Sequence, residues 1–242
     1  MSSTQPSAHV VFAFPGRWLT GSSLVLGPVL LLSGVLLRAR FPFFFPDQLA
    51  AYDGHPALMR ASYSCFAAGT VALWPAVSAL AVRIGATRPT LAAFGGGLTL
   101  VGLFARTFHA GVDQLAFRLV DTQGRRPATA AVADSYQAFH IFQYASFAVM
   151  LGWVVLAAGA WRSGVLGPAR CLALALMALL PLGVLKGTTP LSIAGTSGLC
   201  VALVPLGLTV LFGGPRPTRR SVARFGIAAL VVMVLGFVSS LG

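Results

Sequence analysis

The chain has 242 residues, of which 57% are hydrophobic and only 9% are charged. Soluble domains carry about 25% charged residues, so this composition excludes an ordinary soluble domain. A net charge of +12 would suggest a nucleic-acid partner in a soluble protein. Here the arginines lie mainly at the ends of apolar stretches, where they set membrane topology and contact anionic lipid headgroups. We therefore expect a lipid bilayer as partner, and no nucleic acid.

Apolar stretches long enough to cross a bilayer recur along the whole chain. Residues 1–16 lack the pattern of a signal peptide, so we expect the first stretch to be retained. A hydrocarbon core of ~30 Å needs roughly 20 apolar residues per helix, and no alternation typical of barrel strands is present. The sequence predicts an all-α integral membrane protein, a single domain over 1–242 with a bundle of about seven transmembrane helices. The predicted spans are 18–38, 61–83, 90–118, 136–161, 168–186, 190–213 and 222–241.

The connections between these spans differ in charge. Together with their flanking residues, the connections 84–89, 162–167 and 214–221 carry arginines and no acidic residue. The connections 39–60 and 119–135 hold four of the five aspartates. By the positive-inside rule the first set is cytoplasmic. We therefore expect a plasma-membrane protein with its N-terminus in the cytoplasm and its C-terminus outside. The spans 168–186 and 190–213 could instead form one broken or re-entrant element.

The third span carries the strongest polar motif, Arg106, His109 and Asp113. On a helix these residues fall within ~60° of one another and form one stripe. An aspartate beside a histidine orients the ring and stabilises its charged form, which suits acid–base catalysis. Arg106 could bind a carboxylate or phosphate of a substrate in a planar fork. The alternative is a polar turn at the membrane interface.

The fourth span begins on the same side and places Tyr136, His140, Gln143 and Tyr144 on one predicted helix face. His140 could therefore face His109 and act as a second catalytic group, with the other three side chains binding substrate. The alternative for this face is an interfacial belt of tyrosine and histidine.

The aromatic-rich connection 39–60 could form a lid, which would place the substrate-binding candidates His55 and Arg60 above the pocket. Lys186, the only lysine, is either a substrate ligand or an interfacial lysine whose ammonium reaches the headgroups.

Several chemistries can be weighed from residue types alone. The chain has no glutamate, which excludes an H-E-x-x-H zinc hydrolase. His109, Asp113 and His140, with His55, could hold zinc or iron, and His109 with His140 could ligate haem. Nothing in the sequence requires a cofactor, and it does not specify an oligomeric state. In size and span number the chain resembles groups of small membrane enzymes, membrane terpene cyclases among them. That resemblance implies acidic residues within the spans, and here only Asp113 lies within a predicted span.

Two functions are compatible with this pattern. The first is a membrane-embedded enzyme that acts on a lipid-like or amphipathic small molecule, such as an isoprenoid. It would use His109, Asp113 and His140 for acid–base chemistry in a pocket open to the outer side. The second is a small carrier, exporter or immunity-type membrane component without catalysis, for which polar groups would be expected along a path through both leaflets.

Overall fold

The computed structural model describes residues 16–137, 141–213 and 219–239, and in these ranges it contains helices and no strands. Of the described residues, those up to Leu211 form one compact unit, and those from Phe212 on, with helix α9, form a second unit that is described by itself. The helices are α1 (Arg17–Leu37), α2 (Phe45–Gly54), α3 (Pro56–Gly85), α4 (Pro89–Gln123), α5 (Arg125–Gln137), α6 (Ile141–Arg162), α7 (Pro168–Ala175), the 3₁₀ helix η1 (Leu176–Leu179), α8 (Pro190–Phe212) and α9 (Arg219–Ser239).

Prolines mark where several of these helices begin. Pro56, Pro89, Pro168 and Pro190 are the first residues of α3, α4, α7 and α8. A proline is favourable there because the first turn leaves its backbone N–H groups unpaired and the proline ring presets φ for the helix. The sequence therefore contains local start signals as well as apolar runs, and the predicted all-helical class is confirmed.

Within the described residues, five helices are long and apolar enough to cross a membrane: α1, α3, α4, the part of α6 from Tyr144 to Arg162, and α8. They correspond to the first four predicted spans and the sixth. The predicted span 168–186 differs, because its helix ends at Leu179 and residues 180–189 are irregular. Pro181 and Gly183 explain this end, since proline removes a helical hydrogen bond and Gly183 has a φ of 114°. Helix α9 overlaps the seventh predicted span, and a total of seven spans stays a prediction.

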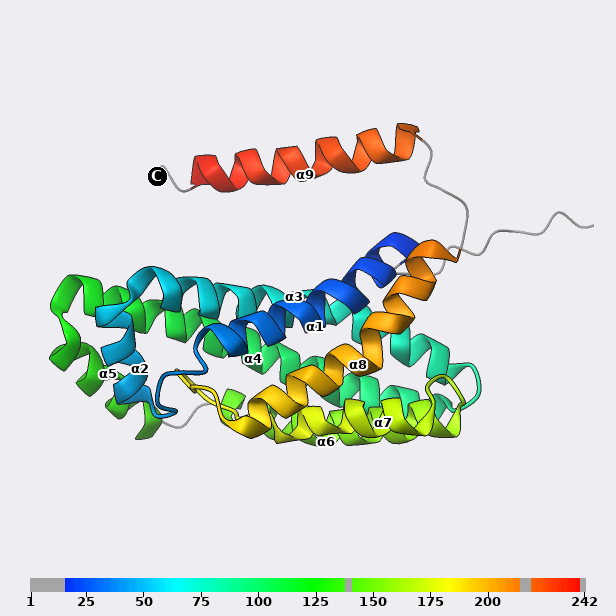
Figure 1. Ribbon diagram of the computed structural model, residues 1–242, viewed down its shortest axis with the longest axis horizontal. Helices are drawn as coiled ribbons and strands as arrows, with labels where there is room; N and C mark the ends of the chain where they lie inside the picture. The colour runs from blue at the N-terminus through cyan, green and yellow to red at the C-terminus, as the bar shows by residue number, and fades with distance from the viewer. Residues whose placement is uncertain (1–15, 138–140, 214–218, 240–242) are drawn as a thin grey trace, which may run out of the picture. The chain divides into compact units, whose positions relative to one another are not determined.

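Two predicted connections are also largely helical. The 39–60 connection contains α2, and the 119–135 connection is replaced by the end of α4 followed by α5. The two short helices lie together at one end of the first unit (Figure 1). Tyr136 lies in α5, whereas Gln143 and Tyr144 lie in α6. The predicted common helix face of these residues runs through positions 138–140, which lie outside the described residues.

The long helices pack closely through small residues. Helix α3 contacts α1 and α4, and α4 also contacts α6 (Figure 1). Gly95 of α4 lies so close to α6 that an added Cβ would fall 2.7 Å from the Leu156 backbone nitrogen. Gly152 of α6 meets Thr99 of α4 in the same way, at 2.5 Å. Missing side chains let two helix backbones approach, which is the usual way helices associate in lipid.

Substitution of Gly95 tests this contact. Gly95→Ala should destabilise the protein by about 1–3 kcal/mol, because the α6 backbone cannot move aside without repacking the core. Gly97→Ala, two residues away, is the matched control, since nothing lies within 4 Å of its added Cβ. Thermal unfolding of the detergent-solubilised protein measures both. Equal melting temperatures for the two variants would contradict the close α4–α6 contact.

Candidate functional site

The site is built around the irregular segment 180–189, which joins η1 to α8. Arg106 of α4 donates hydrogen bonds to the carbonyl oxygens of Leu180 and Pro181, at 3.1 and 3.2 Å. Two turns further along α4, Asp113 accepts the backbone N–H of Leu185 through Oδ1 at 2.5 Å. Both side chains are buried, at 7% and 8% exposure. One face of α4 therefore holds two points of the same segment.

Other elements complete this anchorage. Tyr136 of α5 donates its hydroxyl to the carbonyl of Val184, and Thr188 donates to the carbonyl of Val35 in α1 at 2.8 Å. The backbone N–H of Gly187 donates to the Phe43 carbonyl at 2.9 Å. Burial, with the charge of Asp113 nearby, raises the pKa of Tyr136 to about 12, which keeps the phenol protonated as a donor. The segment is thus irregular in backbone but held from several sides.

Leu185 has an unusual backbone conformation. Its φ is +50°, a region that costs a residue other than glycine about 1–3 kcal/mol unless the surroundings compensate. Its side chain is fully buried in a cluster with Leu49, Met59 and Phe117, and its N–H is bound by Asp113. Packing and a charge-assisted hydrogen bond therefore hold Leu185 in place.

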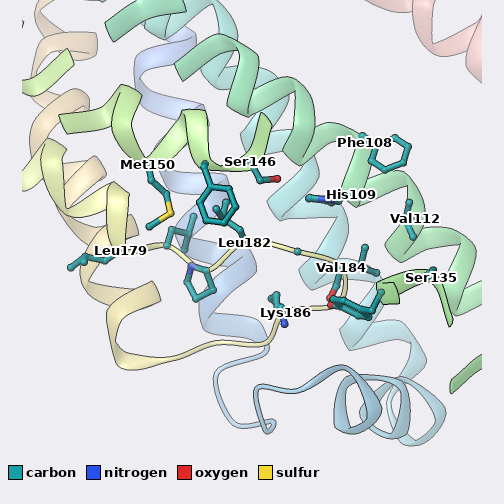
Figure 2. Close-up of a pocket in the computed structure, with 15 residues that line it drawn as sticks. Phe108, His109, Val112, Ser135, Ser146, Met150, Leu179, Leu182, Val184 and Lys186 are labelled. Atoms are coloured by element: carbon teal, nitrogen blue, oxygen red, sulfur yellow. The ribbon is translucent and has the colours of Figure 1, made fainter. Parts of the chain in front are cut away.

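A cavity of about 580 Å³ lies between this segment and helices α4, α5 and α6. Its wall is mainly apolar, with Phe108, Val112, Met150 and Leu182 among the lining residues. Polar groups reach it from His109, Ser135, Tyr136, Ser146 and Lys186 (Figure 2). Cavities of 300–1,000 Å³ that are largely apolar with a few polar groups are typical of small-molecule sites.

The predicted polar stripe of α4 is divided between two cavities. His109 is buried at 7% exposure and lines the large cavity. Arg106 and Asp113 line a second cavity of about 30 Å³, which the same segment also lines, together with Arg38, Tyr63 and Lys186. The smaller volume suffices for little more than a water molecule or a small ion. Arg106 is therefore not a wall residue of the large cavity.

Arg38, which follows the last residue of α1, was not among the residues predicted for the site. Its guanidinium lies 4.6 Å from the ring centroid of Tyr63 and 4.8 Å from that of Phe66, and it donates to Ser62 at 3.3 Å. Arg38 is buried, at 4% exposure. Among the residues that the structure describes, no acceptor contacts its Nε or that of Arg106. The only available signal was an arginine directly at the end of an apolar stretch.

Lys186 lines both cavities. Its Nζ lies 5.1 Å from the ring centroid of Tyr136 and 5.5 Å from that of Phe43, so two aromatic rings hold the ammonium by cation–π attraction. Partial burial lowers the pKa of Lys186 from its ordinary value. Lys186 therefore lies beside both cavities with its ammonium near two rings, and its role as a substrate ligand stays a prediction.

The remaining predicted site residues fall in different places. Tyr136 lines the large cavity, whereas Tyr144 is exposed at 63% and is not among the lining residues. His55 is exposed where α2 meets α3, with its ring 5.6 Å from that of Phe41. His140 lies outside the described residues, as does the side chain of Gln143. The predicted convergence of His109 and His140 therefore stays a prediction.

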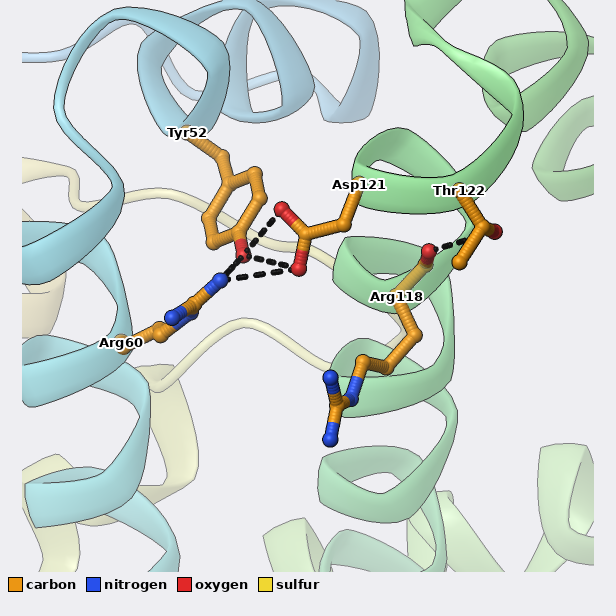
Figure 3. A network of polar contacts seen from close by, with 5 residues as sticks. All are labelled: Tyr52, Arg60, Arg118, Asp121 and Thr122. Carbon is orange, nitrogen blue, oxygen red and sulfur yellow. Dashed lines mark hydrogen bonds and ion pairs between the residues drawn. The ribbon is translucent and has the colours of Figure 1, made fainter.

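Arg60 takes part in a separate polar network. It forms an ion pair with Asp121 of α4 at 2.8 Å and donates to the hydroxyl of Tyr52, which in turn donates to Asp121 (Figure 3). Tyr52 stacks on Phe117 at a centroid distance of 4.2 Å. This network joins α2, α3 and α4 at the end of the unit, and its residues do not line the large cavity.

No three histidine, cysteine or acidic side chains in the described parts of the chain lie in an arrangement that could hold a metal ion. The metal and haem hypotheses involve His140 and so stay untested. No protein-family model, curated protein or solved structure matches the chain.

Removal of the Asp113 carboxylate tests how the segment is held. Asp113→Ala should destabilise the protein by about 1–3 kcal/mol, because the buried N–H of Leu185 loses its acceptor. For a chain of this size each kcal/mol lowers the melting temperature by roughly 2–4 °C. Asp134→Ala, which removes an exposed carboxylate from α5, should change it little. A similar melting temperature for both variants would show that Asp113 does not anchor the segment.

Proposed function

We propose that this chain is a membrane-embedded enzyme that acts on a lipid-like or amphipathic small molecule in the large cavity. The observation that supports this most is the position of His109. It is a buried, titratable side chain in the wall of a cavity of about 580 Å³ that is otherwise mostly apolar. An amphipathic molecule can fill such a cavity, with its hydrocarbon against the apolar wall and a reactive polar group beside the imidazole.

In this proposal His109 is the acid–base residue, because an imidazole changes charge near neutral pH. His140 is proposed as the second acid–base group. Asp113 lies one helical turn from His109 and binds the segment that forms the opposite wall. It contributes by orienting His109 and by positioning that wall. Ser135 and Tyr136 of α5 line the same cavity. Their hydroxyls donate to the carbonyls of Val132 and Val184, so their oxygens remain to accept a hydrogen bond from a substrate.

Comparison of co-purifying small molecules tests the catalytic role. A general acid–base residue contributes about 10²–10⁴-fold to the rate, so His109→Ala should retain unreacted substrate where the native protein retains product or nothing. Native mass spectrometry of both proteins, purified from the same cells, should show bound molecules of different mass. Gln114→Ala, an exposed change on the same helix, should match the native protein.

The same experiment distinguishes a carrier from an enzyme. The irregular segment between η1 and α8 favours a carrier as the second candidate, because broken helices near buried charges are typical of transporters. A carrier would hold the same molecule in the native protein and in His109→Ala. That result, with both proteins folded, would refute the catalytic proposal and leave the binding cavity intact.

We also propose that the chain lies in the plasma membrane with the N-terminus in the cytoplasm. The five long apolar helices are compatible with membrane insertion, and the acid-free, arginine-bearing connections support the orientation. Seven spans then put the C-terminus outside.

Reporter fusions test this topology. A reporter that is active only in the cytoplasm should be active when fused before Ser2 and inactive after Gly242. A reporter active only outside should give the opposite pattern. Activity of one reporter at both ends would refute an odd number of spans.

A further inference from the structure

We propose that the ligand of the large cavity carries an oxyanion headgroup on a single hydrocarbon chain, and that Lys186 binds this headgroup. The inference rests on the proposed binding function of the cavity and adds the charge and shape of the molecule. A carboxylate or a phosphate monoester would satisfy the same chemistry.

The charge balance around segment 180–189 supports an anion. Three cationic side chains, Arg38, Arg106 and Lys186, line the small cavity against one carboxylate, that of Asp113. That carboxylate already accepts the Leu185 N–H. Buried charges in proteins are normally paired, because the cost of removing them from water is large. The residues described here therefore leave positive charge uncompensated beside the large cavity.

Of these three cations, Lys186 is the one that a ligand in the large cavity can contact. It lines the small cavity and the large one, whereas Arg38 and Arg106 line the small one. In the described parts of the chain its ammonium contacts the faces of Tyr136 and Phe43 and takes part in no ion pair. Ring faces accept no strong hydrogen bond, so the three N–H donors of the ammonium suit an oxyanion.

The rest of the cavity suits a hydrocarbon chain. Phe108, Met150 and Leu182 are among the apolar residues of its wall, and Figure 2 shows Lys186 and Leu182 on the same irregular segment, across from α4 and α6. A volume of about 580 Å³ suits a drug-sized molecule, which favours one chain over a diacyl phospholipid. A cationic amphiphile would place a second positive charge beside Lys186 and is disfavoured.

The presence of a single lysine permits a direct test. The full-length protein, in an uncharged maltoside detergent, would be acetylated with an N-hydroxysuccinimide ester, and the modification of Lys186 followed by peptide mass spectrometry. The probe is oleate. Oleyl alcohol has the same chain without the charge, and acetate has the charge without the chain. We expect oleate to slow acetylation of Lys186 about tenfold, which corresponds to occupancy well above half, with little effect of the other two.

Each alternative result overturns the proposal. Equal protection by oleyl alcohol would show that the headgroup charge does not matter, and no protection by oleate would show that Lys186 binds no such anion. Protection in phosphatidylglycerol nanodiscs without oleate, but not in phosphatidylcholine nanodiscs, would assign the contact to a bilayer lipid.

Variants make the test independent of labelling. By native mass spectrometry, Lys186→Met should bind oleate about tenfold more weakly, and Lys186→Arg should keep most of the affinity because the charge is retained. Arg83→Met removes an exposed cation at the end of α3 and should bind as the native protein does. Oleate binding is compared between the native protein and the Lys186 variants, whereas catalysis is tested by His109→Ala, so failure of the catalytic proposal and failure of this one give different results.

Discussion

The structure depends on one interaction, in which two buried charged side chains of α4 hold an irregular stretch of backbone. Arg106 binds the carbonyls of Leu180 and Pro181, and Asp113 binds the N–H of Leu185. Backbone groups outside helices are costly in an apolar interior unless they are paired. Arg106 and Asp113 of α4 pair with such backbone groups, and so the chain between η1 and α8 can be irregular inside the bundle.

This interaction requires a helix that does not move. Helix α4 has 35 residues and is packed on α6 through glycines that leave no room for a side chain, as at Gly95 and Gly152. On its other side it contacts α3. Because α4 is closely packed, the positions of Arg106, His109 and Asp113 relative to one another are fixed by one rigid helix. The path of segment 180–189 is set by its hydrogen bonds to this helix.

The cavity follows from the same arrangement. An irregular segment cannot fill the groove between α4 and α6 as a helix would, and the space that remains is lined by apolar side chains with His109 and Lys186 at its wall. The two residues come from different elements and have different chemistry, since one is an imidazole and the other an ammonium. In the proposals above, His109 acts as an acid or base on an amphipathic molecule whose anionic group Lys186 binds.

The sequence by itself determined the helical class, most helix positions and the polar face of α4. Apolar runs with proline start signals are local properties, and the spacing of Arg106, His109 and Asp113 requires one stripe on any helix. All three residues are indeed buried. The aspartates and the lysine could also be recognised as rare polar groups in an apolar chain.

Tertiary structure alone decided what each of these residues faces. Periodicity gives a direction around the helix axis but does not identify the neighbour, and the neighbour of Arg106 is a carbonyl 74 residues away in the chain. Hydropathy predicted a span over 168–186, because an apolar composition does not reveal that Pro181 and Gly183 end the helix. The stripe was expected to form one pocket, whereas in the folded chain His109 lines one cavity and Arg106 with Asp113 line another.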